Sequence, residues 1–595
     1  MTEKSTPAQG SGLDDVSAKK PLLSDEQAEQ LDRTMHVSLA KLTGGMSPAA
    51  IPLAYLDWLI HLWMAPGKRG LLLEQGMRNW SKLAKYTLEA AMGKNPEPLV
   101  KPSRSERRFG SEAWQRFPFN VMSQQFLLSR EWWESATSEV LGLEAPQQRL
   151  INFAIMQMVD ATSPSNSPIT NPDVLSTTKE QKGKNLVEGM WNLVTDWQQS
   201  ALRQANPNPD GLAVGQDLAV TEGEVVFRNE VMEVLQYKPT TENVYAEPVL
   251  FIPAWIMKYY ILDLRQTNSL YKYLVDQGHT VFTVSWINPT EEHRNFGMET
   301  YLNEGVLKAI EVVQSIVPKQ KIHTVGYCLG GTILSIANAY LGKQKDNPVA
   351  SQTMFAAQTD FTEPGELGLF ITEAQVAFLE SQMWKKGYLT GEQMAGTFSA
   401  LRSNDLVWGK MVEEYMLGNK STLNDLMAWN ADTTRMPYRM HSEYLRTMFL
   451  DNELARDRYK VKGETVSLKD IRIPLFTVGT ETDHVAPWKS VFKINLLTDS
   501  DDITFALTSG GHNAGIVSPV GHPRRSHRIS TSTSQDLTRD PEEWASKQER
   551  VQGSWWGPWE KWLADHSSKE KVAAPAMGSK EFPTIEPAPG QYVLG

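Results

Sequence analysis

The stretch Ile322-His-Thr-Val-Gly-Tyr-Cys-Leu-Gly-Gly-Thr332 decides the fold of this chain. Ile322–Val325 is a short apolar run that predicts a buried strand, and Thr332–Tyr340 predicts a helix. Between them, Gly326 and Gly330 lie two residues before and two residues after Cys328. A tight strand-to-helix turn with glycines at these positions holds its central residue in a strained, exposed conformation. The stretch therefore predicts a nucleophile elbow that presents the thiol of Cys328.

Short apolar runs on both sides of this turn predict the rest of a sheet. Glu224–Arg228 and Glu230–Tyr237 read as a β-hairpin joined at Asn229. Strands separated by helices are typical of parallel βαβ units with both faces of the sheet covered. Together with the elbow, the pattern predicts an α/β-hydrolase fold. The further runs are Val249–Ile252, Thr280–Val284, Thr353–Ala357, Pro474–Val478 and Ile503–Leu507.

The segments around the sheet predict additional parts. The N-terminal region has the apolar spacing of helices, and Asn206-Pro-Asn-Pro-Asp-Gly211 marks its end. The gap between two of the strands is too long for a simple connection. It predicts a helical cap over the sheet, or an ordinary insertion without a gating role. The expected organisation is a disordered tail (1–24), an N-terminal helical domain (25–210) and a catalytic domain (211–595). The catalytic domain is expected to contain a cap insertion (about 360–470) and a C-terminal segment (541–595) that begins with a Trp-rich helix over 541–565.

The acid and the base of a catalytic triad are expected after the elbow, in that order. Asp483 follows the strand Pro474–Val478, and His512, between glycines, follows the strand Ile503–Leu507. Glu481 and His484 are the weaker alternatives for the two roles. An imidazole and a helix N-terminus beside Cys328 would both favour its thiolate form.

An oxyanion hole requires two backbone N–H groups. One is expected from Leu329, and the other from Trp255 or Ile256, because Pro253 in the same loop has no N–H. A cysteine nucleophile suits acyl transfer from a thioester, because exchange between thioesters costs little free energy and keeps the acyl group activated. The same residues would also serve hydrolysis.

Composition limits the remaining possibilities. The 595 residues carry a net charge of -11, which argues against a nucleic-acid partner. The one cysteine excludes an intramolecular disulfide and fits a cytoplasmic protein, and the polar stretch Met1–Leu22 has no signal-peptide pattern. Met46–Met64 is apolar but interrupted by Pro52, Asp57 and His61, so we expect a helix that packs on protein or on an apolar surface and no transmembrane segment. The 19 Trp predict extensive core packing, or contact with an apolar surface. The basic run from Arg524 to Arg528 is expected to be a solvated face or, less often, an anion contact.

Several of these motifs resemble those of polyhydroxyalkanoate synthases, whose lipase-like box has Cys in place of Ser. Gly326–Gly331 resembles that box, and the resemblance covers about 90–595. Ala254 and Met257 depart from the Pro and Asn expected in the oxyanion loop, which bears on substrate preference. The other resembling segments are Asp483–Trp488, Gly511–Gly515, Trp255–Leu264, Val284–Pro289, Asn404–Trp408, Tyr444–Arg446, Pro164–Asn166, Thr170–Pro172, Gly553–Trp556 and Ala588–Val593.

The resemblance implies a class I enzyme that polymerises a (R)-3-hydroxyacyl-coenzyme A, such as 3-hydroxybutyryl-coenzyme A, and releases coenzyme A. It implies Cys328 as the acyl carrier, His512 as its base, and Asp483 as the residue that orients His512 or activates the incoming 3-hydroxyl. It implies a homodimer on cytoplasmic polymer granules beside phasins. No metal and no cofactor are expected apart from the coenzyme A of the substrate. The alternatives are a cysteine thioesterase of the same fold and a granule-coating protein without activity.

Overall fold

The computed structural model describes residues 24–43, 45–102, 106, 108–202, 212–394, 396, 407–420 and 424–595. The expected disordered tail up to residue 23 lies outside the described residues. The expected domain boundary at 206–211 and the motif residues 404–406 lie outside them as well.

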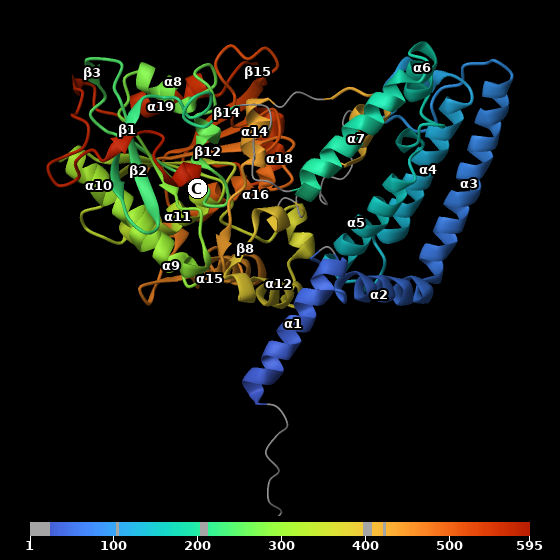
Figure 1. The fold of residues 1–595 in the computed structure, drawn as a ribbon, viewed down its shortest axis with the longest axis horizontal. Coiled ribbons are helices and arrows are strands. Elements are labelled where there is room, and N and C mark those ends of the chain that lie inside the picture. The colour runs from blue at the N-terminus through green and yellow to red at the C-terminus, as the bar shows by residue number, and fades with distance from the viewer. Residues whose placement is uncertain are drawn as a thin grey trace, which may run out of the picture.

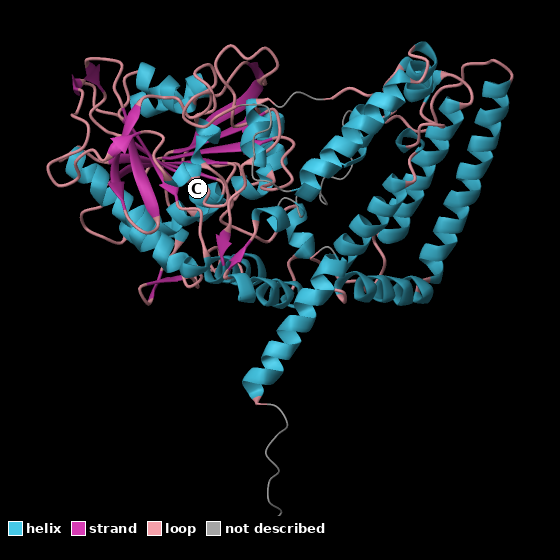
Figure 2. Cartoon of the chain, viewed as in Figure 1, coloured by secondary structure: helices cyan, strands magenta, loops and turns pink. Residues whose placement is uncertain are grey.

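The catalytic part is built on a twisted eleven-stranded sheet (Figures 1 and 2). Its central strands pair in parallel, and antiparallel strands flank them on both sides. The strands, in spatial order, are β15 (Val551–Gln552), β14 (Ser526–Ser532), β13 (Ile503–Thr508), β12 (Leu475–Thr480), β7 (Val349–Phe355), β6 (Ile322–Tyr327), β4 (Val249–Ile252), β5 (Val281–Trp286), β2 (Met232–Tyr237), β1 (Gly223–Arg228) and β17 (Glu586–Pro587).

The predicted strands are confirmed, with shifts of a few residues at their ends. The connection of β1 and β2 lies at Asn229, whose side-chain oxygen accepts hydrogen bonds from the N–H groups of Val231 and Met232. Every residue of β4, β5, β6, β12 and β13 is buried, which explains why these strands are rich in apolar residues and contain no Asp, Glu, Lys or Arg. β14, between β13 and the edge strand β15, was not predicted, because a strand of polar residues has no apolar run to mark it.

Helices cover both faces of the sheet. On one face, α10 (Lys308–Ile316) and α11 (Leu329–Gly342) pack in one large core cluster. On the other face, α8 (Leu270–Asp276) and α19 (Trp556–Asp565) pack in a second cluster. This second cluster contains the buried side chains of Trp555, Trp556 and Trp559, so the core-packing prediction is confirmed for these residues.

The expectation of a single Trp-rich helix over 541–565 is wrong. The segment forms α18 (Pro541–Lys547) and α19, separated by the edge strand β15. β15 hydrogen-bonds to β14, and Gly553 follows it with a φ of +115°. A left-handed glycine and a strand pairing cannot be part of a continuous helix.

The N-terminal helices stand beside the catalytic part (Figure 1). Ser24 and Gln27 exchange side-chain-to-backbone hydrogen bonds at the start of the first helix. The apolar residues from Arg130 to Met158 have the spacing of one helix, but the structure breaks this run at 138–144. The helices are α1 (Asp25–Thr43), α2 (Ala50–Met64), α3 (Pro66–Ala91), α4 (Phe119–Thr137), α5 (Ala145–Ala161), α6 (Pro172–Glu180) and α7 (Lys184–Leu202).

The apolar segment expected at Met46–Met64 forms α2. Ala54 and Trp58 are buried, and the indole N–H of Trp58 donates to the carbonyl of Ala136. Leu53, Ile60 and other apolar residues of the helix are exposed. Across the described ranges, we find no helix with the length and apolar character that a membrane crossing requires.

The segment between β7 and β12 is mostly helical and lies at the junction of the two parts. α1 packs along α12 (Glu373–Lys386), and α7 packs on the π-helical segment η8 (Met411–Met416). Asn185 and Asn192 of α7 donate hydrogen bonds to the carbonyls of Met416 and Glu414. The other elements of this segment are η6 (Glu366–Phe370), β8 (Tyr388–Leu389), α14 (Asp425–Ala431), β9 (Met436–Pro437), α15 (Tyr438–Tyr444), η9 (Leu445–Leu450), β10 (Lys460–Val461), β11 (Glu464–Thr465) and η10 (Leu468–Asp470).

The remaining elements are short. They are η1 (Glu112–Gln115), η2 (Pro164–Asn166), β3 (Asn243–Val244), η3 (Tyr259–Leu262), η4 (Glu291–His293), α9 (Met298–Thr300), η5 (Tyr301–Leu307), α16 (Trp488–Phe492), α17 (Ile494–Leu497), β16 (Val572–Ala573) and η11 (Tyr592–Leu594).

Candidate active site

Cys328 lies at a strained turn between β6 and α11. Its φ is +52°, in the left-handed region that L-residues rarely adopt. The turn is held by its N–H, which donates to the carbonyl of Phe355 on the neighbouring strand at 2.9 Å. A Cβ atom at Gly326 would lie 2.4 Å from Cα of Gly331, and one at Gly330 would lie 1.9 Å from the carbonyl oxygen of Ile252. Both glycines are therefore required by the close approach of backbone to backbone.

His512 and Asp483 lie together at the C-terminal ends of the adjacent strands. Nδ1 of His512 is 2.8 Å from Oδ2 of Asp483. The carboxylate also accepts hydrogen bonds from the hydroxyl of Thr480 and from the N–H groups of Val485 and Ala486, each at 2.9 Å. All of its lone pairs that face protein are thus engaged, which holds the side chain in one orientation.

The electrostatics of this pair favour the ionised forms. Burial opposes the charge of His512, but the charges of Asp483 and Cys328 and hydrogen bonds to both outweigh it and hold the pKa of His512 well above its usual value. Burial likewise opposes the charge of Asp483, but the imidazolium and the surrounding donors lower the pKa of this carboxyl. Because Cys328 is among the groups that raise the pKa of His512, the third predicted residue lies near the pair.

The alternative acid, Glu481, is bound elsewhere. Its carboxylate pairs with the guanidinium groups of Arg528 and Arg550. The positive charge of Arg528, in the basic run predicted as a solvated face, is therefore paired with a carboxylate. His527 of the same run is buried on β14. Within the described residues, Asp483 is the carboxylate that hydrogen-bonds His512.

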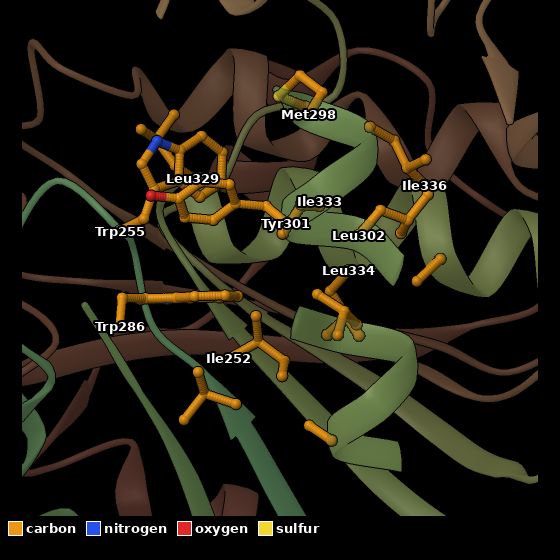
Figure 3. Packing of buried hydrophobic residues seen from close by; sticks show 14 of the residues in the cluster. Ile252, Trp255, Trp286, Met298, Tyr301, Leu302, Leu329, Ile333, Leu334 and Ile336 are labelled. Atoms are coloured by element: carbon orange, nitrogen blue, oxygen red, sulfur yellow. The ribbon is translucent and has the colours of Figure 1, made fainter. Parts of the chain in front are cut away.

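The predicted oxyanion donors lie on two segments that meet beside Cys328. Leu329 is the first residue of α11, so its N–H has no acceptor within the helix. Ile256 lines the same cavity as Cys328 and Leu329. The side chain of Trp255 points instead into the core beside Tyr301 and Leu329 (Figure 3). The oxyanion donors are backbone N–H groups of this loop, so Trp255 and Ile256 both stay candidates for the second donor.

The oxyanion loop, residues 253–257, is contacted from two sides, by the core on the sheet and by the segment between β7 and β12. Below it, the indole N–H of Trp286 donates to the carbonyl of Pro253 at 2.8 Å, and its ring packs on Tyr301 (Figure 3). Above it, Met257 forms a β-bridge with Thr433, and the hydroxyl of Thr434 donates to the carbonyl of Trp255 at 3.3 Å. The cap segment thus contacts the backbone that would supply an oxyanion donor.

Cys328 opens into a cavity of about 890 Å³. Its walls are largely apolar and include the amide side chains of Gln358, Gln375, Gln382 and Gln393. The cavity is closed by parts that are distant in sequence: the elbow, the segment between β7 and β12, and the end of α1 with the loop that follows it. The lining includes Val37, Ala40, Met46, Ile256, Phe361, Leu379, Leu389, Met436, His441, Tyr444, Leu445 and Phe449.

The cavity also contains residues that the sequence analysis did not single out. Gln375 of α12 accepts a hydrogen bond from the N–H of Ser47 at 2.7 Å and donates one to the carbonyl of Gly45 at 3.0 Å. His441 lies on α15, one turn before Tyr444. No local motif marks Gln375 or His441, because their roles depend on neighbours more than 100 residues away in sequence or on the shape of the cavity.

Comparisons with known proteins place this geometry in a family. Residues 26–68 match a family described as "Poly-beta-hydroxybutyrate polymerase N terminal", and residues 105–274 match one described as "Poly-beta-hydroxybutyrate polymerase (PhaC) N-terminus". Residues 247–519 match the alpha/beta hydrolase fold family. A poly(3-hydroxyalkanoate) polymerase of Methylorubrum extorquens is 36% identical over 90% of this chain and 89% of its own. The chain belongs to the poly(3-hydroxyalkanoate) polymerase family.

Other members of the family match over nearly the whole chain. The "Poly(3-hydroxyalkanoate) polymerase subunit PhaC" of Rhizobium meliloti is 33% identical over 99% of both chains. That of Cupriavidus necator is 36% identical over 92% of both chains. The expected family and the α/β-hydrolase fold are thus confirmed, and the family membership includes the N-terminal helices as well as the sheet.

Proposed function

We propose that this chain polymerises a (R)-3-hydroxyacyl-coenzyme A, 3-hydroxybutyryl-coenzyme A in the first place, into a polyester that grows on the sulfur of Cys328. The observation that carries the proposal is the thiol at a strained elbow, near the His512–Asp483 pair, in a largely apolar cavity. Membership of the poly(3-hydroxyalkanoate) polymerase family supports the class of substrate and product.

In the first step, His512 accepts the thiol proton of Cys328 and the thiolate attacks the thioester carbonyl. The oxyanion accepts hydrogen bonds from the N–H group of Leu329 and from that of Trp255 or Ile256. When the tetrahedral adduct collapses, the bond from carbon to the sulfur of coenzyme A breaks. The leaving thiolate takes the proton from His512, and the acyl group remains on Cys328.

In the second step, the 3-hydroxyl of one acyl unit attacks the thioester carbonyl of another. His512 accepts the hydroxyl proton and returns it to the departing sulfur. The product is an oxygen ester, which is more stable than the thioester and drives growth forward. We assign Asp483 to orienting His512, because its oxygens are already occupied by the imidazole and by the N–H groups of Val485 and Ala486.

The test is to supply purified protein with 3-hydroxyacyl-coenzyme A donors of several lengths. We expect release of coenzyme A together with polymer that can be collected and weighed. Cys328→Ala should lose more than ~10³-fold of the activity, as expected for removal of a covalent nucleophile. His512→Gln should be similarly impaired, with His522→Gln on an outer loop as the matched control.

A cysteine thioesterase is the competing function. It would release coenzyme A and free 3-hydroxy acid but no polymer, and that result would overturn the proposal. The long segment that encloses the cavity from above and the N-terminal helices favour the polymerase, because hydrolysis by water requires neither. A protein without activity would leave Cys328→Ala indistinguishable from the unaltered chain.

The proposal includes contact of the N-terminal helices with the polymer surface. Trp63, Trp80, Trp191 and Trp197 are 69–74% exposed, and many apolar side chains of α2, α3 and α7 lie around them. Indole is favoured where an apolar phase meets water. Trp80→Glu combined with Trp191→Glu should weaken co-sedimentation with poly(3-hydroxybutyrate) particles. If these helices instead form the interface of a homodimer, the double variant would change the sedimentation coefficient and leave particle binding intact.

A further inference from the structure

A buried lysine follows directly on the oxyanion loop. Lys258, the residue after Met257, is 4% exposed. Lysine side chains are seldom buried unless polar partners receive their N–H groups. Nζ of Lys258 donates to the backbone oxygen of Gly595 at 2.7 Å and lies 3.5 Å from that of Tyr592. One side chain thus connects the oxyanion loop to a segment that is more than 330 residues away in sequence.

The segment Tyr592–Gly595, here called the support segment, is itself attached to the sheet. The N–H groups of Gln591 and Tyr592 donate to the buried carboxylate of Glu233 on β2, at 3.2 and 3.1 Å. The hydroxyl of Tyr592 donates to the carbonyl of Asn229 at 2.6 Å, in the connection of β1 and β2. The acceptors of Lys258 therefore have a fixed position relative to the sheet.

Asn288 joins the same acceptor to the segment between β7 and β12. Its Nδ2 donates to the backbone oxygen of Gly595 at 3.0 Å, and its Oδ1 accepts from the backbone N–H and from Nε of Arg435 at 3.0 and 3.1 Å. Arg435 lies two residues after Thr433, which forms the β-bridge with Met257. The contacts close a ring that runs through the oxyanion loop, the support segment and the segment above the cavity.

The charges near Lys258 do not replace these hydrogen bonds. Burial lowers the pKa of Lys258, the charge of Asp432 opposes this effect, and that of Arg435 adds to it. The carboxylate of Asp432 accepts a hydrogen bond from the hydroxyl of Tyr260 at 2.8 Å. Within the described residues, both hydrogen-bond acceptors of Nζ belong to the support segment. Loss of the side chain would therefore release the loop from that segment.

The two candidate oxyanion donors lie between two attachment points. At the start of the loop, the carbonyl of Pro253 is bound by the indole of Trp286, and at its end Lys258 is bound to the support segment. The N–H groups of Trp255 and Ile256 lie on the backbone between these points. An oxyanion donor acts only when it lies within about 2.7–3.1 Å of the developing charge, so a small shift of this backbone would weaken it.

We propose that Lys258 is a positioning residue of the oxyanion hole, whose buried side chain fixes the oxyanion loop to the support segment and thereby places the second N–H donor. The inference rests on the proposed function, because it takes a thioester carbonyl at Cys328 as the group that reacts. Lys258 acts through the loop, while His512 serves the proton transfers.

The experiment compares two reactions of Cys328 in the full-length protein. Acylation by 3-hydroxybutyryl-coenzyme A forms an oxyanion, whereas alkylation by iodoacetamide displaces iodide from a saturated carbon and forms none. Rapid quenching and intact-protein mass give the rate of acylation in a single turnover at saturating donor, and the rate of alkylation. We expect Lys258→Met to lower the acylation rate about 10-fold, part of the effect of removing an oxyanion donor, and to leave the alkylation rate unchanged. Lys238→Met, at an exposed lysine just after β2, is the matched control.

Asn288→Ala tests the same connection from its other side. It should show the same selective loss of acylation. The double variant with Lys258→Met should lose less than the product of the two single losses, because both side chains bind the backbone oxygen of Gly595. Asn288→Ala also keeps Lys258 in place, so it carries the test if Lys258→Met does not fold.

The two rates separate this inference from a general defect and from the proposed function. Equal loss of both rates, or an unchanged acylation rate, would overturn the role of Lys258, and so would losses that multiply in the double variant. If the unaltered protein is alkylated at Cys328 but is not acylated by the donor, the proposed function is overturned instead.

Discussion

At the scale of single residues, the pair of His512 and Asp483 links catalysis to stability. The pKa of His512 is raised, so its protonation stabilises the fold fully below its ordinary pKa of 6.5, and this contribution is lost as pH rises through the raised value. The pKa of Asp483 is lowered, so its ionisation stabilises the fold fully above its ordinary pKa of 3.8, and this contribution is lost as pH falls through the lowered value. Both contributions are complete between these two ordinary values.

Asp483→Asn should therefore lower the thermal unfolding midpoint most between pH 3.8 and 6.5, and less on either side. Activity should also fall, because the amide supports the wrong tautomer of His512. The measurement is the unfolding midpoint of both proteins across the pH range, with Asp451→Asn at an exposed position as the control. A midpoint difference that is independent of pH would contradict an ion pair at this position.

At the scale of elements, the elbow depends on how closely α11 approaches β4. Gly330→Ala would place a Cβ atom 1.9 Å from the carbonyl oxygen of Ile252, which must then move. Since Leu329 and Ile256 lie beside this contact, the expected result is a loss of acylation rate of about 10²-fold, the size of effect of removing one oxyanion donor. The measurement is the rate of Cys328 acylation by 3-hydroxybutyryl-coenzyme A in a single turnover, followed by intact-protein mass.

The matched control is Gly557→Ala, at the second position of α19, where the added Cβ atom would meet nothing within 4 Å. Both glycines are second residues of a helix, so the helix propensity gained is similar in the two variants. Equal activity of the two variants would show that the approach of α11 to β4 does not set the oxyanion geometry.

At the scale of the whole molecule, the N-terminal helices complete a cavity whose floor belongs to the sheet. Gln375 joins α12 to the loop after α1 through hydrogen bonds to Gly45 and Ser47. Gln375→Ala removes both bonds, so we expect faster proteolytic cleavage near residue 47 and a higher KM for the acyl donor. Limited proteolysis and steady-state kinetics provide the measurement. Gln344→Ala, an exposed position at the end of α11, serves as the control. If cleavage and KM stay at their original values, the loop is held by other contacts.

The sequence by itself determined the elbow, the order of the parallel strands along the chain and the candidate residues Cys328, Asp483 and His512. These features are local: glycine spacing follows from backbone approach, and buried parallel strands appear as apolar runs. The tertiary structure decided the rest. The strand β14 and the break between α18 and α19 both depend on pairing or packing with distant segments. The cavity wall formed by α1 and the burial of His441 also depend on distant segments. The residues that enclose a cavity are neighbours in space but have no common pattern in sequence.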